Sequence, residues 1–314
     1  MKIGFLYPGQ GSQFVGMGRD LYAEYPVVKD IYTKASDILG FDVGKVSFHG
    51  RDRELRKTEN TQVTVLIHSL AIQSILREEG VTPYLSAGHS LGEYSAVIAA
   101  KGISFEDGLQ LVRLRGELMS EAGNSYHGRM AAIIGLSLSV VEEMCKNLSS
   151  SGTIVIANIN TPHQIVLSGE IEVINKATEL ARKAGAKKSV LLPVSGAFHS
   201  PLMKEAAVKF SEALGKVRFN DLETSIIGNV SAQEIDKKED VRRELTSQMS
   251  SPVRWLESMN RMFELGINKF VEVGPGKVIK GLLLNIDRKV EVLSTSDING
   301  LSRTLEVLEK WKEQ

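Results

Sequence analysis

The sequence predicts an α/β protein in which a large parallel-sheet domain carries a smaller, ferredoxin-like domain as an insertion. Short apolar runs alternate with amphipathic helical patterns along most of the 314 residues, which is typical of a parallel sheet covered by helices. In the middle of the chain the order changes to β-α-β-β-α-β, the split βαβ arrangement. We therefore expect a discontinuous large domain at residues 1–126 plus 195–314 and a ferredoxin-like domain at residues 127–194.

The large domain begins with an apolar strand at residues 2–7, which stops at Pro8-Gly9-Gln10-Gly11. Glycine and proline end such runs because they favour turns. The later elements expected in this domain are a buried helix at 62–79, a strand at 85–88 that leads into a helix, a helix at 105–122, and a strand at 269–273 followed by a helix at 277–284.

The inserted domain is predicted from two helical and four β-rich segments. Turn-forming residues, Asn-Thr-Pro-His, separate the two middle strands, and Gly185 ends the second helix. The expected strands are residues 130–135, 153–158, 164–168 and 188–194, and the expected helices are 137–148 and 170–184.

The composition excludes several classes of protein. The 38 Lys and Arg residues balance 38 Asp and Glu residues, so no overall field attracts nucleic acid or an anionic membrane. No apolar stretch is long enough to span a bilayer, and the first one ends too early for a signal peptide. The single cysteine, Cys145, lies in a helical pattern and is interpreted as a small core residue. We expect a cytoplasmic protein that binds neither nucleic acid nor membrane.

Gly88-His89-Ser90-Leu91-Gly92 matches the G-x-S-x-G pattern of a nucleophile elbow. A predicted strand precedes it and a helix with small residues follows, which is the strand-turn-helix context that the motif requires. Ser90 would then lie at a helix N-terminus, where free N–H groups and the helix dipole favour an oxyanion. The alternative is that Ser90 only caps an ordinary helix.

His199 is the best candidate for the base that a serine nucleophile needs. It lies in a loop of small residues directly after the last strand of the insert, where the chain re-enters the large domain. The alternative is an ordinary surface histidine. The other five histidines adjoin the serine, lie in a buried helix or lie in loop-like sequence: His89, His68, His49, His127 and His163.

The third member of a catalytic triad is not evident. The only aspartate between Ser90 and His199 is Asp107, which is interpreted as the N3 acid of a helix capped by Ser104. A backbone carbonyl can orient the imidazole instead, because the third group need only fix its tautomer.

Arg115 lies on the apolar face of the helix predicted at 105–122. An unpaired charge in that position is costly, so the guanidinium must find an anion that the local sequence does not supply. One interpretation is a structural carboxylate from elsewhere in the fold. The other is a clamp on a substrate carboxylate, such as the free end of a malonyl thioester. The neighbours of Arg115 at three and four residues are Leu111, Val112, Leu118 and Met119.

The glycine-rich segment 9–16 follows the first strand but does not match a nucleotide-binding motif. Its spacing is G-x-G-x-x-x-x-G, without a Walker lysine or a clear acidic residue on a second strand. A backbone N–H near Gln10 can instead complete an oxyanion hole with that of Leu91. No histidine pair has the spacing of metal ligands, so no metal is expected.

These segments together resemble the malonyl-CoA:acyl carrier protein transacylase family. They occur in the order of the family over nearly the whole chain, which makes the resemblance more specific than any single motif. The segments are Pro8-Gly9-Gln10-Gly11-Ser12-Gln13, Gly88-His89-Ser90-Leu91-Gly92-Glu93, Arg115, Gly196-Ala197-Phe198-His199-Ser200, Gln248 with Pro252-Val253-Arg254-Trp255, and Glu272-Val273-Gly274-Pro275-Gly276.

The resemblance implies a hydrolase-like α/β domain with a ferredoxin-like insert, and a ping-pong reaction. Ser90 would attack malonyl-CoA with His199 as base, and the acyl group would pass to the phosphopantetheine thiol of an acyl carrier protein. No resident cofactor is implied, since phosphopantetheine belongs to the carrier. The family also suggests a monomer and a role in fatty-acid synthesis.

The resemblance also implies roles for individual residues. The backbone N–H groups of Gln10 and Leu91 would form the oxyanion hole, and Arg115 would bind the malonyl carboxylate. The region of Gln248 would supply the carbonyl that orients the base. Phe198 resembles the residue of malonyl-selective members, since methylmalonyl-selective relatives tend to have a smaller one there.

Three alternatives remain open at this stage. An acyltransferase that serves a polyketide synthase in trans would use the same residues, although Gly196 departs from the histidine that such relatives often have. A thioesterase or other hydrolase could use Ser90 and His199 but would leave Arg115 without a clear role. A non-catalytic module that binds CoA or carrier protein would not need Ser90, His199 and Arg115 together.

Overall fold

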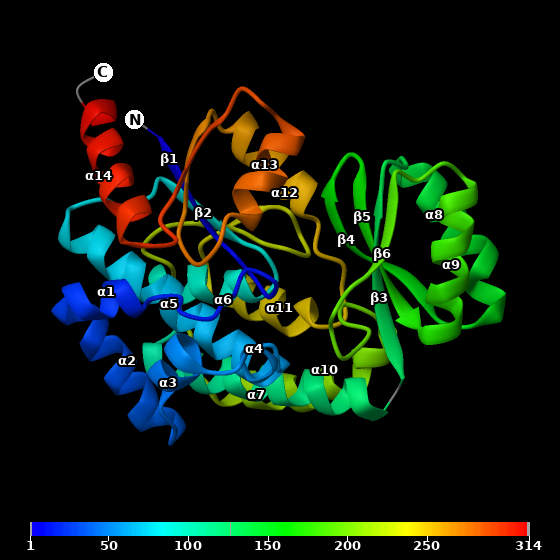
Figure 1. Cartoon of the computed structure of the whole chain (residues 1–314), viewed down its shortest axis with the longest axis horizontal. Helices are drawn as coiled ribbons and strands as arrows, with labels where there is room; N and C mark the ends of the chain where they lie inside the picture. The colour runs from blue at the N-terminus through cyan, green and yellow to red at the C-terminus, as the bar shows by residue number, and fades with distance from the viewer. Residues whose placement is uncertain (1, 126, 313–314) are drawn as a thin grey trace.

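The computed structural model describes residues 2–125 and 127–312 as two lobes, each built on its own sheet (Figure 1). The larger lobe contains a six-stranded sheet in the order β10-β9-β1-β2-β7-β8. Its strands pair in parallel, except for the antiparallel pair of β7 and β8. The strands are β1 (Ile3–Tyr7), β2 (Leu85–Gly88), β7 (Ile226–Ile227), β8 (Glu234–Ile235), β9 (Lys269–Glu272) and β10 (Glu291–Ser294).

Helices cover both faces of this sheet because its strands are apolar on both sides. Phe5 and Tyr7 of β1 point into one core, and Leu6 between them points into the other. The helices of the larger lobe are α1 (Arg19–Glu24), α2 (Pro26–Leu39), α3 (Val43–His49), α4 (Asp52–Leu55), α5 (Thr58–Glu78), α6 (Leu91–Ala99), α7 (Phe105–Ser125), α10 (Lys204–Lys216), α11 (Lys238–Gln248), α12 (Trp255–Glu264), α13 (Val278–Ile286) and α14 (Ile298–Lys312). A 3₁₀ turn, η2 (Pro201–Met203), precedes α10.

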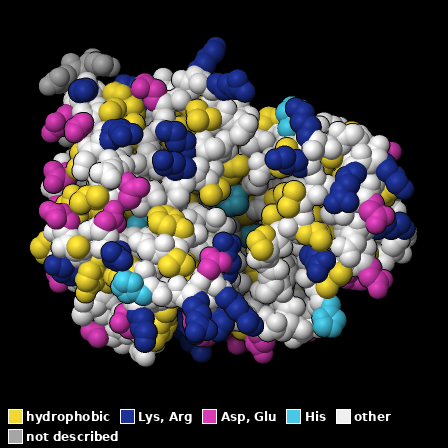
Figure 2. Space-filling view, in the orientation of Figure 1, with side chains coloured by type: hydrophobic (Ala, Val, Ile, Leu, Met, Phe, Trp, Pro, Cys, Tyr) yellow, Lys and Arg dark blue, Asp and Glu magenta, His cyan; other side chains and the backbone are white. Residues whose placement is uncertain are grey.

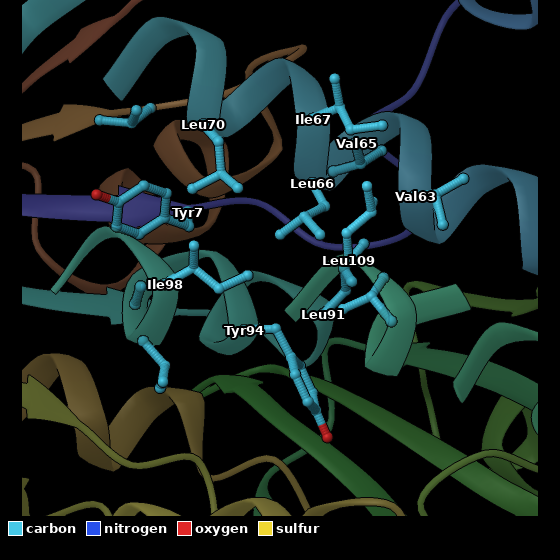
Figure 3. Packing of buried hydrophobic residues seen from close by; sticks show 14 of the residues in the cluster. Tyr7, Val63, Val65, Leu66, Ile67, Leu70, Leu91, Tyr94, Ile98 and Leu109 are labelled. Carbon is cyan, nitrogen blue, oxygen red and sulfur yellow. The ribbon is translucent and has the colours of Figure 1, made fainter. Parts of the chain in front are cut away.

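Helix α5 is the centre of the larger core, and most of its residues are buried. Leu66 and Leu70 of α5 lie among Tyr7 of β1 and Leu91 and Ile98 of α6 in the same hydrophobic cluster (Figure 3). The packing fixes α6, which carries the candidate nucleophile at its start, against the sheet.

Helix α5 begins at Thr58, four residues before the predicted start at residue 62. The polar residues of its first turn look loop-like in the sequence, yet they are buried. Thr61 Oγ1 donates to the carbonyl of Leu55 at 2.6 Å, and Asn60 Nδ2 donates to the carbonyl of Glu54 at 3.0 Å. These bonds to α4 satisfy the polar side chains, so the helix starts earlier than its apolar pattern does.

The smaller lobe is an antiparallel sheet in the order β4-β5-β3-β6, with two helices on the side away from the larger lobe (Figure 1). This strand order and the β-α-β-β-α-β sequence are those of the ferredoxin-like fold. Its elements are β3 (Gly128–Ile134), α8 (Leu138–Leu148), the 3₁₀ turn η1 (Ser149–Ser151), β4 (Ile154–Thr161), β5 (Gln164–Glu170), α9 (Ile171–Lys183) and β6 (Lys188–Leu191).

The predicted α/β fold, with a parallel sheet and a small antiparallel one, is thereby confirmed. The elements of the smaller lobe fall inside the predicted insert at 127–194, although β6 ends at Leu191 and not at residue 194. The predicted domain limits at residues 1, 126 and 314 lie outside the described residues. Within the described part of the chain, every helix is too short or too polar to cross a bilayer.

The register of the parallel sheet brings several loops to one edge. Tyr7 pairs with Gly88, and Leu6 pairs with Glu272, so β1, β2 and β9 end side by side. Ligands of open α/β sheets bind beyond the carboxyl ends of the strands. The loops that follow these strands contain the glycine-rich segment and the predicted nucleophile elbow.

Candidate active site

The elbow at Ser90 is held in a conformation that its two glycines make possible. Ser90 has φ 50° and ψ −103°, between the end of β2 and the start of α6. A Cβ on Gly88 would lie 1.9 Å from the carbonyl carbon of Gly92, and a Cβ on Gly92 would lie 2.0 Å from the carbonyl oxygen of Tyr7. The G-x-S-x-G pattern therefore follows from the close packing of the backbone.

The alternative that Ser90 only caps α6 does not fit the geometry. Ser90 occupies the N-cap position, but its side chain makes no capping hydrogen bond. Its Oγ instead lies 2.8 Å from Nε2 of His199. A serine hydroxyl beside an imidazole nitrogen is the arrangement of an activated nucleophile.

His199 is oriented by two backbone carbonyl oxygens and not by a carboxylate. Its Nδ1 lies 3.0 Å from the carbonyl oxygen of Gln248 and 3.1 Å from that of Ser251. A carbonyl oxygen can only accept, so Nδ1 carries the proton and Nε2 is left to accept from Ser90. The carbonyl of Ser251 was not among the predicted site residues. Asp107 does not orient His199, because it bonds Ser104 at the start of its helix, as the capping interpretation predicts.

The surroundings keep His199 neutral. Its side chain is buried, and that burial, together with the nearby Arg115 guanidinium, lowers the pKa of His199 to about 3. The imidazole is therefore in its neutral form, with Nε2 free to accept a hydrogen bond from Ser90, throughout the neutral pH range.

Arg115 is fully buried and contacts the candidate nucleophile, Ser90. Its Nη2 donates to Ser90 Oγ at 3.1 Å and to Gln248 Oε1 at 2.9 Å, and its Nη1 donates to Gln62 Oε1 at 2.8 Å. The guanidinium also lies over the ring of Tyr94, with 5.2 Å between Cζ and the ring centroid.

The groups that contact this guanidinium are neutral, and Gln248 lies between it and the carboxylate of Glu93. Among residues 2–125 and 127–312, the ion pairs within 4.0 Å do not include Arg115, so no described carboxylate pairs with it directly, and the charge of Glu93 acts on it from a greater distance. Burial accordingly lowers the pKa of Arg115 from its ordinary value. By contrast, Arg113, two residues earlier, forms an ion pair with Glu117. A buried cation that only amides and hydroxyls contact is suited to bind an incoming anion.

A buried network that the sequence did not predict lies behind the elbow. The side-chain amide of Gln248 donates to the carbonyl of Ser90 at 2.8 Å and also to a carboxylate oxygen of Glu93. The other oxygen of Glu93 accepts from the backbone N–H of Asn229 at 2.8 Å. Burial raises the pKa of Glu93 well above its usual range, with the charge of Glu244 adding to the effect.

One sequence signal could have revealed part of this network. Glu93 is the only charged residue in the otherwise apolar helix α6, so its carboxylate must find partners in the core. The partners themselves, Asn229 and Gln248, lie 136 and 155 residues away and carry no local signal.

The elbow opens into a cavity of about 240 Å³ between the two lobes. Figure 2 shows the surface hollowed between them. Both lobes line the cavity with apolar side chains and amides, and the larger lobe alone adds a serine, two histidines and an arginine to this lining. The larger lobe contributes Gly9, Gln10, Gln62, His89, Ser90, Leu91, Arg115, Met119, Phe198, His199, Val278, Ile279 and Leu282. The smaller lobe contributes Met130, Ala132, Asn158, Asn160, Gln164 and Val166, with Leu192 and Val194 from the segment that follows β6.

The two predicted oxyanion-hole residues both border this cavity beside Ser90. Leu91 is the first residue of α6, so its backbone N–H has no acceptor within the helix. Gln10 follows Gly9, where a Cβ would lie 2.4 Å from the carbonyl oxygen of His89. The glycine-rich loop thus passes close to the elbow.

The remaining candidates lie apart from the reacting groups. His89 directs Nε2 to Asn160 Oδ1 of the smaller lobe at 2.8 Å, and His68 is buried within α5. Cys145 is half-buried in the smaller lobe, where burial raises the pKa of its thiol to about 11. Within the described ranges, His, Cys, Asp and Glu do not gather in any group of three that could hold a metal ion.

Comparison with known proteins points to a single family. The family model described as "Acyl transferase domain" matches residues 4–296. The malonyl CoA-acyl carrier protein transacylase of Bacillus subtilis is 41% identical over 310 residues, which cover 98% of each chain.

Solved structures agree with this comparison. The malonyl CoA-acyl carrier protein transacylase of Coxiella burnetii superposes with a TM-score of 0.95 at 34% identity, covering 98% of this chain and 97% of that one. A malonyl-transacylase solved in complex with a type II polyketide synthase acyl carrier protein has a TM-score of 0.95 at 37% identity, covering 98% and 99%. With a G-x-S-x-G serine, a histidine and a buried arginine in one cavity, and relatives that cover 98% of it, this chain belongs to the acyl transferase domain family.

Proposed function

We propose that this chain transfers the malonyl group from malonyl-CoA to the phosphopantetheine thiol of an acyl carrier protein, through an ester on Ser90. The observation that carries this proposal is the position of Ser90 Oγ, which lies 2.8 Å from His199 Nε2 and 3.1 Å from Arg115 Nη2. The proposed nucleophile therefore lies within hydrogen-bond distance of the cation that is proposed to bind the substrate carboxylate. The names of the relatives support the same reaction.

In the first half-reaction, Ser90 Oγ attacks the thioester carbonyl while its proton passes to His199 Nε2. The two backbone carbonyls on Nδ1 stabilise the imidazolium that forms. The N–H groups of Leu91 and Gln10 are proposed to bind the oxyanion of the tetrahedral intermediate. The intermediate collapses by breaking the carbon–sulfur bond, and His199 returns the proton to the departing CoA thiolate.

Arg115 is proposed to select malonyl over neutral acyl groups. The malonyl carboxylate is one methylene from the attacked carbonyl, so it must lie close to Ser90, where Nη2 already points. Binding a carboxylate there pairs a charge that only neutral groups contact. An acetyl group offers no such partner, and the arginine then keeps its bonds to Gln62 and Gln248.

In the second half-reaction, the carrier thiol attacks the Ser90 ester, and His199 takes the thiol proton. Serine is the leaving group and recovers its proton from His199, so the site returns to its starting state. The acceptor brings its own phosphopantetheine, and the reaction therefore needs no resident cofactor. We propose that the protein acts as a monomer in the cytosol and supplies fatty-acid synthesis.

The test is the intact mass of the protein after brief exposure to malonyl-CoA, followed by addition of holo carrier protein. We expect a malonyl adduct on Ser90 that discharges onto the carrier thiol. An adduct lost to water at the same rate with or without carrier would make the protein a hydrolase. Binding of CoA without any adduct would contradict an enzymatic role and favour a non-catalytic module.

A further inference from the structure

Asn229 lies against the nucleophile elbow although it is 139 residues from Ser90 in sequence. It follows the short strand β7, which pairs in parallel with β2 through Ser86 with Ile226 and Ala87 with Ile227. Paired parallel strands end at the same edge of a sheet. The loop after β7 therefore reaches the elbow that follows β2.

The side-chain amide of Asn229 bonds the elbow on both sides of its bend. Its Oδ1 accepts from the Ser90 N–H at 2.7 Å, and its Nδ2 donates to the Gly88 carbonyl at 2.7 Å. The backbone ladder cannot continue here, because the φ of 50° at Ser90 is not that of a strand. The Asn229 amide thus takes the place of a neighbouring strand. This role needs one acceptor and one donor side by side, and a planar side-chain amide has both.

Asn229 is itself firmly held. It is 1% exposed; its N–H donates to Glu93 at 2.8 Å, and its carbonyl accepts from the Arg254 N–H at 2.9 Å. Glu93 also binds Gln248, whose amide donates to the Ser90 carbonyl. The buried Glu93 carboxylate thus binds the backbone N–H of Asn229 and the side chain of Gln248, and the side-chain amides of these two residues bond the N–H and the carbonyl of Ser90. Strained backbone persists only where such surroundings over-determine it.

We propose that Asn229 is a positioning residue for acyl transfer, whose amide holds the Ser90 backbone so that the Ser90 hydroxyl faces His199 and the Leu91 N–H faces the cavity. The inference rests on the proposed function, because it gives Asn229 a part in that reaction. Asn229 does not line the cavity. Its loss should therefore slow the chemical step and leave thioester binding nearly unchanged.

The first test is Asn229→Ala, which removes both bonds to the elbow. We expect acyl-enzyme formation about 100-fold slower than in the wild type, since a displacement of about 1 Å has that effect on positioned groups. The loss should be equal for malonyl-CoA and acetyl-CoA, and KM should change by less than about threefold. Asn285→Ala is the matched control, because that exposed amide also donates to a backbone carbonyl, that of Gly281, away from the cavity.

Asn229→Asp separates positioning from folding. A protonated aspartic acid keeps the acceptor for the Ser90 N–H and the donor for the Gly88 carbonyl, whereas an aspartate has no donor. The charged groups that face this position are Glu93 on α6, Glu244 on α11 and Arg254 before α12. The acylation rate relative to wild type should exceed that of Asn229→Ala at pH 5.5 and should fall as the pH rises and the aspartic acid ionises. The corresponding ratio for Asn229→Ala should not change with pH.

Two results would overturn the proposal. One is an acylation rate for Asn229→Ala within about twofold of wild type. The other is an Asn229→Asp variant that acylates no faster than Asn229→Ala at pH 5.5, where burial and the carboxylates of Glu93 and Glu244 favour the protonated form. Failure of the proposed function would look different, because the wild type itself would then take no malonyl group. Modification of Ser90 by a serine-directed fluorophosphonate, which needs no thioester, would still compare Asn229→Ala with the wild type.

Discussion

The two walls of the cavity differ in how their polar side chains are bonded. On the larger lobe, polar groups at the reacting end are buried and bound by several partners, as Arg115 is bound by Gln62, Gln248 and Ser90. On the smaller lobe, the wall consists of apolar side chains and three amides, among which only Asn160 bonds the elbow region, through His89. The comparison indicates that the larger lobe holds the chemistry and the smaller lobe shapes the space around it.

The two walls meet at the segment that orients the base. Gln248 and Ser251 direct their carbonyls to His199, and Val253, two residues later, pairs with β4 of the smaller lobe. Val253 N–H donates to the Ala157 carbonyl at 2.8 Å, and its carbonyl accepts from the Ile159 N–H at 3.0 Å. The position of the smaller lobe is thus tied directly to the orientation of the imidazole.

The largest effect is expected from Ser90→Ala, which removes the hydroxyl that is proposed to form the acyl ester. Acyl transfer should fall by about 10⁴-fold or more, as for other serine nucleophiles. Stopped-flow assays of CoA release and intact mass would measure the loss. The reference is Ser95→Ala on the same helix, where the serine is buried but does not line the cavity. Residual acylation at another residue would contradict the assignment of Ser90.

Arg115→Ala tests whether the charge on the larger wall binds the substrate. We expect malonyl transfer to fall about 100-fold, which matches the loss of a charge-assisted hydrogen-bonded pair. Acetyl transfer should change far less, since acetyl lacks the carboxylate. Arg113→Ala is the control, because that arginine pairs with Glu117 at the surface. Equal losses for both acyl groups would assign Arg115 a purely structural role.

The sequence predicted the parts of the larger wall that depend on local pattern. The elbow was predicted because G-x-S-x-G lies between a strand and a helix, and the helical position of Arg115 placed it on an apolar face. The carbonyl of Gln248 was expected from the family resemblance and lies 3.0 Å from His199 Nδ1.

The rest of the wall depends on long-range packing. Ser251, Gln62 and Asn229 reach the site through loops and helices that are distant in sequence, so no spacing reveals them. The pairing of β2 with a two-residue strand, β7, is equally invisible, because Ile226 and Ile227 are too short a run to predict a strand. That pairing nevertheless places Asn229 at the elbow.

Phe198→Leu tests the shape of the cavity, where a smaller effect is expected. Phe198 is buried beside the base and borders the cavity. A smaller side chain leaves room for a branched acyl group, so the preference for malonyl over methylmalonyl should fall about tenfold, the usual scale for one methyl group. The ratio of the two kcat/KM values measures this. Phe14→Leu, at an exposed position, should leave the ratio unchanged, and an unchanged ratio in Phe198→Leu would exclude this residue as a determinant.

The smallest effect concerns pH, and it tests whether burial on the larger wall keeps the base neutral. Burial, and then the Arg115 guanidinium, lower the pKa of His199 to about 3, so the neutral form is lost only as the pH falls toward that value. Acylation of the wild type should therefore change by less than about twofold between pH 7.5 and pH 5.5, whereas a base with an ordinary pKa of about 6.5 would lose about tenfold. Single-turnover acylation, with far-UV circular dichroism as a check on folding, measures the profile.

Removing the guanidinium raises the pKa of His199, so Arg115→Gln, assayed with acetyl-CoA, should lose activity at a higher pH than the wild type does. A wild-type rate that falls with a midpoint near pH 6.5 would mean that the working base is solvated, and the contrast between the two walls would then not extend to His199.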